Sequence, residues 1–122
     1  MEKYSTKNKL DIIIQLAKEK KAEDLISLNV ENVSSLTDRI IICSGDRTMH
    51  TRAIGKYIIE ETKKMDMKMH HQEGIQNGTW ILLDFGDVVM HIFDRSAREF
   101  YKLDELWKEL AKKVEHNLSE YT

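Results

Sequence analysis

The chain of 122 residues contains no proline and one cysteine. A single cysteine cannot form an internal disulfide, which excludes a disulfide-stapled fold and fits a reducing compartment. Cys43 lies in an apolar run, so we expect a buried small hydrophobic side chain there and not a nucleophile. No linker or low-complexity tract interrupts the sequence, and we therefore predict one domain over residues 1–122.

Long apolar runs and a dominant charge of one sign are also absent. No stretch approaches the roughly 20 apolar residues of a membrane span, and the N-terminus has no apolar signal region. We therefore expect a cytoplasmic protein without a membrane partner. The chain carries 19 basic and 21 acidic side chains. This balance argues against a protein that neutralises nucleic-acid phosphates, and we expect no direct sequence-specific binding of nucleic acid.

The periodicity of apolar residues predicts helices and strands in mixed order. Helical stripes follow Ser5 or Thr6, follow Gly45 as far as Met65, and cover residues 103–114. Alternating and β-branched runs predict five strands, at residues 26–30, 39–44, 67–71, 79–83 and 88–93. This order is typical of an α/β or α+β domain, in which helices flank a mixed five-stranded sheet.

The most informative segment is a predicted β-hairpin at residues 78–93, with its turn at Phe85-Gly86. A two- or four-residue loop at this turn places Trp80 opposite His91 and Leu83 opposite Val88. Side chains alternate between the two faces of a strand, so one face of the hairpin is apolar and typical of a core. The other face mixes an aromatic ring, aliphatic groups, carboxylates and an imidazole: Trp80, Leu82, Asp84, Asp87, Val89 and His91.

Two interpretations of this mixed face remain open from the spacing. A tryptophan beside aliphatic groups, with carboxylates at the rim, is typical of the centre of a protein interface. Alternatively, a helix covers the face, so that Trp80 belongs to the core and His91 is a buried, hydrogen-bonded histidine. A three-residue loop would break the grouping altogether.

Motifs that would support catalysis are weak. Residues 84–86 match the Asp-Phe-Gly tripeptide of kinases, but the chain has no phosphate loop and no catalytic loop. Residues 44–46, with Asp84 and Asp87 as metal ligands, suit a nucleotidyltransferase-like enzyme that uses Mg²⁺ and a nucleotide, which is our alternative function. Carboxylates beside a turn more often stabilise the turn itself. The five histidines lack ligand spacing, and we predict no catalytic residue, metal or cofactor.

Several segments occur together in a specific order. An apolar strand from Asp38 ends in Ser44-Gly45, and the segments that follow it are Arg52-Ala53-Ile54, Glu73-Gly74, residues 80–93 and residues 98–107. In this order and spacing the chain resembles the ribosomal silencing factor family, also called the RsfS or Iojap family. The similarity covers roughly Lys9 to Trp107.

The resemblance implies a compact fold related to nucleotidyltransferases but without their catalytic apparatus, and hence a protein that is not an enzyme. It implies binding to ribosomal protein uL14 on the large subunit, which sterically blocks the small subunit and represses translation when nutrients are scarce. It also implies a homodimer in isolation. The recurrent surface residues of the family, together with Leu82 beside Trp80, give the predicted partner-binding set: Glu73, Trp80, Leu82, Asp84, His91, Arg98 and Tyr101.

Overall fold

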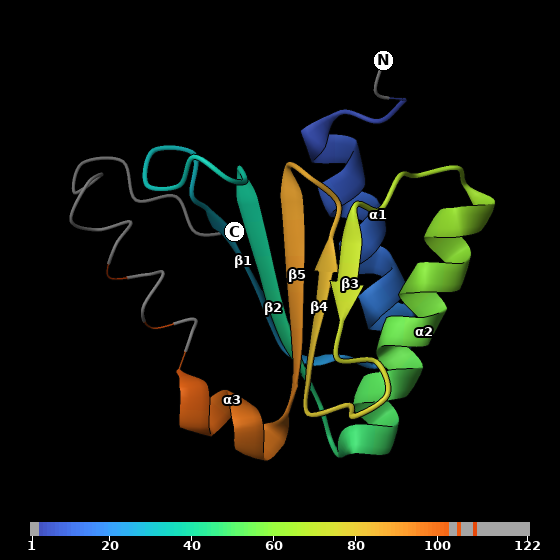
Figure 1. Ribbon diagram of the computed structural model, residues 1–122, viewed down its shortest axis with the longest axis vertical. Coiled ribbons are helices and arrows are strands. Elements are labelled where there is room, and N and C mark those ends of the chain that lie inside the picture. The colour runs from blue at the N-terminus through green and yellow to red at the C-terminus, as the bar shows by residue number, and fades with distance from the viewer. Residues whose placement is uncertain (1–2, 103–104, 106–108, 110–122) are drawn as a thin grey trace.

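The computed structural model of the chain describes residues 3–102, 105 and 109. Three helices and five strands follow one another as α1 (Thr6–Glu19), β1 (Glu23–Asn29), β2 (Arg39–Gly45), α2 (Thr48–Lys64), β3 (His71–Glu73), β4 (Trp80–Asp84), β5 (Val88–Asp94) and α3 (Arg95–Tyr101) (Figure 1). The predicted α+β fold with a mixed five-stranded sheet is confirmed. No helix in the described part of the chain is long and apolar enough to cross a membrane.

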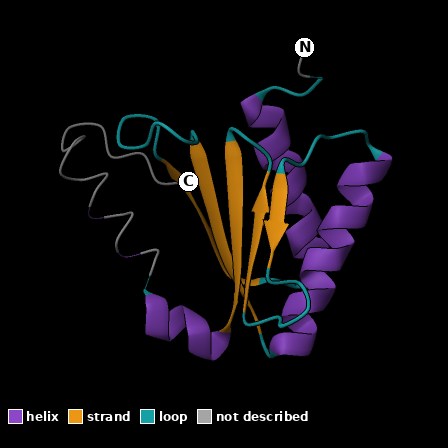
Figure 2. Cartoon of the chain, in the orientation of Figure 1, coloured by secondary structure: helices purple, strands orange, loops and turns teal. Residues whose placement is uncertain are grey.

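The sheet has the strand order β1-β2-β5-β4-β3. β2 and β5 run parallel, whereas the other three neighbouring pairs are antiparallel. α1 and α2 lie on one side of the sheet and α3 lies on the other (Figure 2). The sheet is therefore the middle layer, and each of its faces packs against different elements.

The face covered by α1 and α2 forms the larger core. It joins apolar residues of both helices to the inward side chains of three strands, including Ile41, Cys43, Ile81, Leu83, Met90 and Ile92. Cys43 is a free, fully buried cysteine, and burial raises the pKa of its thiol to about 12. The predicted small hydrophobic role of this residue is confirmed.

The opposite face holds a second, smaller core under α3. Leu28, Val30, Ile40, Ile42, Phe93 and Ala97 are buried there, and Trp80 packs against them while only partly buried. We call the part of this sheet face that carries Trp80, Leu82, His91 and Phe93 the aromatic face.

The register of the hairpin differs from the prediction by two residues. Trp80 pairs with Phe93, and Leu82 pairs with His91. The turn lies one residue further along than predicted, because Gly86, with φ +92°, adopts a backbone conformation that suits glycine. A shift of two leaves the alternation of faces unchanged, so Trp80, Leu82 and His91 still share one face.

Asp87 is the exception to the predicted grouping. Its carboxylate accepts hydrogen bonds from the buried ammonium of Lys9, at 2.8 Å, and from the hydroxyl of Thr6. Lys9 also donates to the backbone oxygen of Phe85 at 3.0 Å. Asp87 therefore faces α1 and fixes the hairpin turn to that helix, because a turn residue does not follow the alternation of the strands.

Three further expectations need correction or lie outside the structure. β3 spans only His71–Glu73, and the predicted strand residue Met67 is instead buried in the larger core. α3 begins at Arg95, in a segment where we predicted no helix. Of the helix predicted at residues 103–114, the structure describes only Glu105 and Glu109.

Candidate functional site

A pocket of about 340 Å³ opens on the aromatic face. It is lined by Glu73, Gly74, Trp80, Leu82 and His91. β4 and β5 supply the last three because alternate residues of neighbouring strands point to the same side. We call it the Trp80 pocket, and it brings together four of the seven side chains predicted to bind a partner.

Trp80 is held in place by contacts on several sides. Its indole Nε1 donates a hydrogen bond to Nδ1 of His91 at 3.0 Å. The indole ring centroid lies 5.0 Å from that of Phe93 and 4.6 Å from that of Tyr101. The polar end of the indole is thus satisfied within the protein, and the apolar ring remains available to a ligand or partner.

His91 is a neutral residue of this site. Burial lowers the pKa of its imidazole to about 4. Because Nδ1 accepts the proton of Trp80, the neutral ring carries its own proton on Nε2. The pocket therefore gains no positive charge from His91 at neutral pH.

Two aromatic side chains of α3 continue the row of rings that begins at Trp80. Tyr101 packs against Trp80 and is 47% exposed, and Phe100 is 79% exposed with its ring 5.0 Å from that of Tyr101. Large exposed apolar groups beside a pocket are typical of interaction surfaces. Sequence reasoning missed Phe100, because only the structure shows that its ring lies against Tyr101, which in turn packs on Trp80.

One carboxylate lines the pocket, and a second lies further along the same face. Glu73 is exposed and accepts a hydrogen bond from Nε2 of His71. Asp84 follows Trp80 and Leu82 along the same face of β4, and its Oδ1 accepts from the backbone N–H of Gly86 at 2.8 Å. Asp84 therefore stabilises the turn at the end of this face, whereas Glu73 lines the pocket directly.

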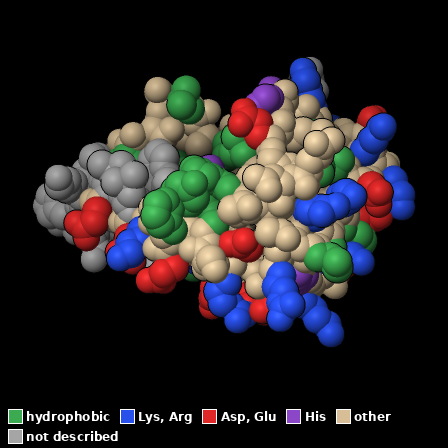
Figure 3. Space-filling view, turned by 60° about the horizontal axis from the view of Figure 1, so that its bottom comes forward, with side chains coloured by type: hydrophobic (Ala, Val, Ile, Leu, Met, Phe, Trp, Pro, Cys, Tyr) green, Lys and Arg blue, Asp and Glu red, His purple; other side chains and the backbone are tan. Residues whose placement is uncertain are grey.

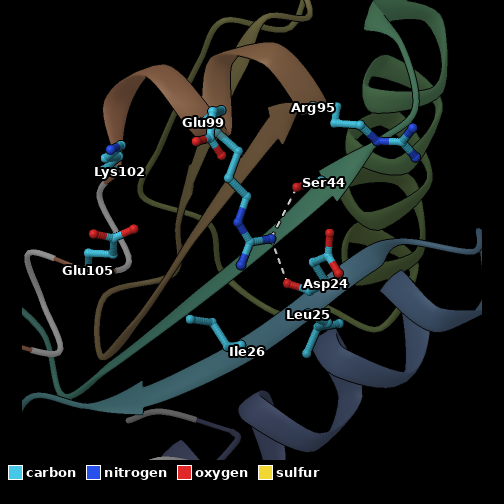
Figure 4. Close-up of a pocket in the computed structure, with 9 residues that line it drawn as sticks. Asp24, Leu25, Ile26, Ser44, Arg95, Glu99, Lys102 and Glu105 are labelled. Carbon is cyan, nitrogen blue, oxygen red and sulfur yellow. Dashed lines mark hydrogen bonds between the residues drawn. The ribbon is translucent and has the colours of Figure 1, made fainter.

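Arg98 lies apart from the Trp80 pocket. It lines a separate hollow of about 420 Å³ between α3 and the strands β1 and β2 (Figure 4). Its Nη1 donates to the backbone oxygen of Asp24 at 2.5 Å and to the hydroxyl of Ser44 at 3.1 Å. The guanidinium of Arg98 is therefore directed at β1 and β2 and not into the Trp80 pocket.

The geometry does not favour the alternative of a nucleotide- and Mg²⁺-dependent enzyme. The carboxylate of Asp84 caps the turn, and that of Asp87 binds Lys9 and Thr6 on the side of α1. Within residues 3–102, 105 and 109, no group of three or more potential ligands is placed to hold a metal ion. The two carboxylates that such a site requires are engaged in separate contacts.

The charges on the surface are mixed. On the side of the molecule shown in Figure 3, basic and acidic side chains are interspersed and hydrophobic side chains gather beside them. This agrees with the near-balance of charge in the sequence. On this side, recognition therefore depends on local groups and not on a broad field of one sign.

Comparison with known proteins gives a consistent result. Residues 3–121 match the family model described as "Ribosomal silencing factor during starvation". The chain is 33% identical over 101 residues to the ribosomal silencing factor RsfS of Bacillus subtilis, covering 83% of this chain and 86% of that protein. It is 37% identical over 87 residues to RsfS of Haemophilus influenzae, covering 71% and 85% respectively.

A solved structure supports the same assignment. The crystal structure of a protein from Chromobacterium violaceum matches with a TM-score of 0.82 and 27% identity, covering 85% of this chain and 87% of that one. The family model spans nearly the whole sequence, and the fold, the motifs and the relatives agree. The chain therefore belongs to the ribosomal silencing factor family.

Proposed function

We propose that this chain represses translation under nutrient limitation by binding ribosomal protein uL14 on the large subunit, where it sterically blocks the small subunit. The observation that carries the proposal is the Trp80 pocket with its aromatic extension on α3. Family membership supplies the ribosomal context. A ribosome-bound regulator of this kind acts in the cytoplasm.

The chemistry of the site suits a basic protein partner. Interface hot spots are enriched in tryptophan and tyrosine, which bury a large area at low entropic cost. Trp80 and Tyr101 offer such a centre, and Glu73 and Asp84 place negative charge beside it. Ribosomal proteins are generally basic, so these carboxylates favour encounter and orientation.

The proposal needs no reacting group. Steric blocking requires only a bound body of sufficient size, and no catalytic residue, cofactor or metal is assigned. This is consistent with the engagement of Asp84 and Asp87 in structural contacts. The proposed docking surface consists of Glu73, Trp80, Leu82, Asp84, His91, Phe100 and Tyr101, with Arg98 nearby on α3.

Co-sedimentation with isolated large ribosomal subunits tests the proposal. We expect the chain to pellet with large subunits and to reduce the yield of joined ribosomes when small subunits are added. Trp80→Ala should weaken binding by about 2 kcal/mol, because it removes the proposed anchor. Met49→Ala is the matched control, since Met49 is 79% exposed but lies on α2, on the other side of the sheet. Failure of the unaltered chain to pellet would contradict the proposal.

We also propose that a second copy of the chain competes for the same surface. The exposed rings of Phe100 and Tyr101 continue from Trp80, and such a surface suits self-association when no ribosome is present. Sedimentation velocity over a range of concentrations should show a dimer that Phe100→Ser reduces. Addition of purified uL14 should replace that dimer with a mixed complex, and a dimer that persists at saturating uL14 would contradict the competition.

A further inference from the structure

α3 depends on contacts with the rest of the chain. It has seven residues, and isolated helices shorter than about 12 residues are marginal in water. Ala97 is its one buried residue, and the ring of half-exposed Tyr101 adds packing against Trp80 and Phe93, so few apolar contacts hold the helix. Polar contacts between α3 and the strands are therefore well placed to add to the stability of its position on the sheet.

Arg98 makes the polar contacts that lead from α3 into two strands. Its Nη1 bonds both the backbone oxygen of Asp24 in β1 and the hydroxyl of Ser44 in β2, as the dashed lines in Figure 4 show. Ser44 is 1% exposed, so one acceptor lies inside the protein. Hydrogen bonds from a charged group to buried acceptors are stronger than neutral ones.

The backbone of β1 is irregular at the residue that accepts this contact. The register between β1 and β2 shifts between Glu23 and Ile26, and Asp24 adopts φ +48° within that irregularity. A bulge of this kind changes the direction of local backbone groups. Here it accompanies an Asp24 carbonyl that accepts from Arg98.

The same short helix carries Tyr101 to the Trp80 pocket. Tyr101 follows Arg98 by three residues, within one turn, and its ring packs 4.6 Å from that of Trp80. Movement of α3 away from β1 and β2 would therefore remove Tyr101 from Trp80. We propose that Arg98 is a positioning residue of the docking surface, which fastens α3 to β1 and β2 and so holds Tyr101 against Trp80 without touching the partner itself.

Arg95 is the competing candidate for this role. It pairs with the carboxylates of Glu23 and Asp46, but its side chain is 63% exposed. Exposed ion pairs contribute little, because water and salt screen them. Arg98 instead donates to a backbone carbonyl and to a buried hydroxyl, so Arg98 is the better anchor.

A spectroscopic experiment tests the inference without a ribosome. The chain has two tryptophans, so Trp107→Phe leaves Trp80 as the single reporter. In that background we expect Arg98→Met to shift the emission of Trp80 to longer wavelength and to increase its quenching by acrylamide about twofold. Methionine keeps an apolar stem at this position, so the variant removes the polar contacts with little loss of packing.

Companion variants separate positioning from other effects. Ser44→Ala should change the emission in the same direction, although Ser44 is buried and cannot meet a partner. Arg98→Lys keeps the charge but not the planar guanidinium, and should restore the signal only in part. Glu99→Gln, an exposed neighbour in the same hollow, is the control and should change nothing. Unchanged Trp80 emission in both Arg98→Met and Ser44→Ala would overturn the inference.

The consequence for docking rests on the proposed function and is measured by a double-mutant cycle with isolated large subunits. We expect Arg98→Met to weaken binding about fivefold, and to add nothing once Tyr101→Ala is present, because both changes remove the same contact. Full additivity would overturn the positioning role and make Arg98 a direct contact. If the unaltered chain binds no large subunits, the proposed function fails, and the emission of Trp80 alone decides the role of Arg98.

Discussion

The hydrogen bond between Trp80 and His91 decides what the pocket presents to a partner. Nε1 of Trp80 donates to Nδ1 of His91, which fixes the tautomer of the neutral imidazole and satisfies the indole. The sequence placed both residues on one face, but it left open whether that face is covered. The structure gives an intermediate answer, because α3 covers part of the face and leaves Trp80 partly buried.

The state of His91 makes the stability of the protein depend on pH. Its pKa is about 4 in the folded chain, against an ordinary value of 6.5. Between these values the unfolded chain binds more protons than the folded chain. The free energy of unfolding therefore rises as the pH increases from about 4 to 6.5, and the same stability is lost when the pH is lowered through this range. The free energy of unfolding therefore differs by about 3 kcal/mol between a pH above 6.5 and a pH below 4, as far as His91 is concerned.

Urea unfolding at several pH values between 4 and 7 measures this dependence. His91→Asn offers Trp80 an oxygen acceptor but does not titrate, so its stability should vary less over the same range. Other acidic groups titrate in both proteins, and only the difference between the two curves reports on His91. Identical curves for the two proteins would contradict the predicted role.

At the scale of elements, the alternation of side chains was predictable and the register was not. The alternation of side chains along the strands was enough to group Trp80, Leu82 and His91 on one face. A pairing that is wrong by two residues leaves this grouping unchanged. The identity of the turn residue depended on Gly86 and on the anchoring of Asp87 by Lys9, a contact between distant parts of the chain. Sequence patterns near the hairpin contain no information about such a contact.

α3 was missed because its signal is short. Asp94 caps the helix, since its Oδ1 accepts from the N–H of Ala97 at 2.8 Å, and only Ala97 is buried among the residues of the helix. A stripe of apolar residues, on which helix prediction relies, is therefore lacking. The aspartate before Arg95 was the available indication.

The cap at Asp94 should matter for both stability and docking. Asp94→Ala should lower the free energy of unfolding by about 1 kcal/mol, because the first turn of α3 loses its acceptor. Binding to large subunits should weaken as well, since α3 carries Tyr101. Thermal melts and co-sedimentation measure the two effects. Asp94→Ser retains a capping oxygen and should behave much more like the unaltered chain; equal damage from both substitutions would exclude capping as the cause.

At the scale of the whole molecule, two cores share one sheet. β2 contributes Ile41 and Cys43 to the larger core, and Ile40 and Ile42 to the smaller one. Because residues of β2 alternate between the two cores, unfolding of this strand would remove packing partners from both. We therefore propose that residues 1–122 form one folding unit.

Calorimetry distinguishes one unit from two. A single transition is expected, with equal calorimetric and van't Hoff enthalpies, as small cooperative domains show. Ile42→Ala, in the smaller core, should lower the midpoint of that one transition. A second transition that appears in this variant would show that α3 and its core unfold separately.

The molecule is nearly neutral as a whole, so the negative charge near the Trp80 pocket is a local feature. Because the chain is nearly neutral, attraction to a basic partner depends on where its carboxylates lie, and Glu73 lines the Trp80 pocket. Glu73→Lys should slow association with large subunits several-fold at low salt, since rim charges act mainly on the association rate. Glu60→Lys makes the same change of net charge on α2, across the sheet from the pocket, and should have little effect.

Stopped-flow association at two salt concentrations measures both variants, and the difference between them should shrink as salt screens the charges. Equal slowing by the two substitutions would assign the effect to net charge and remove Glu73 from the docking surface.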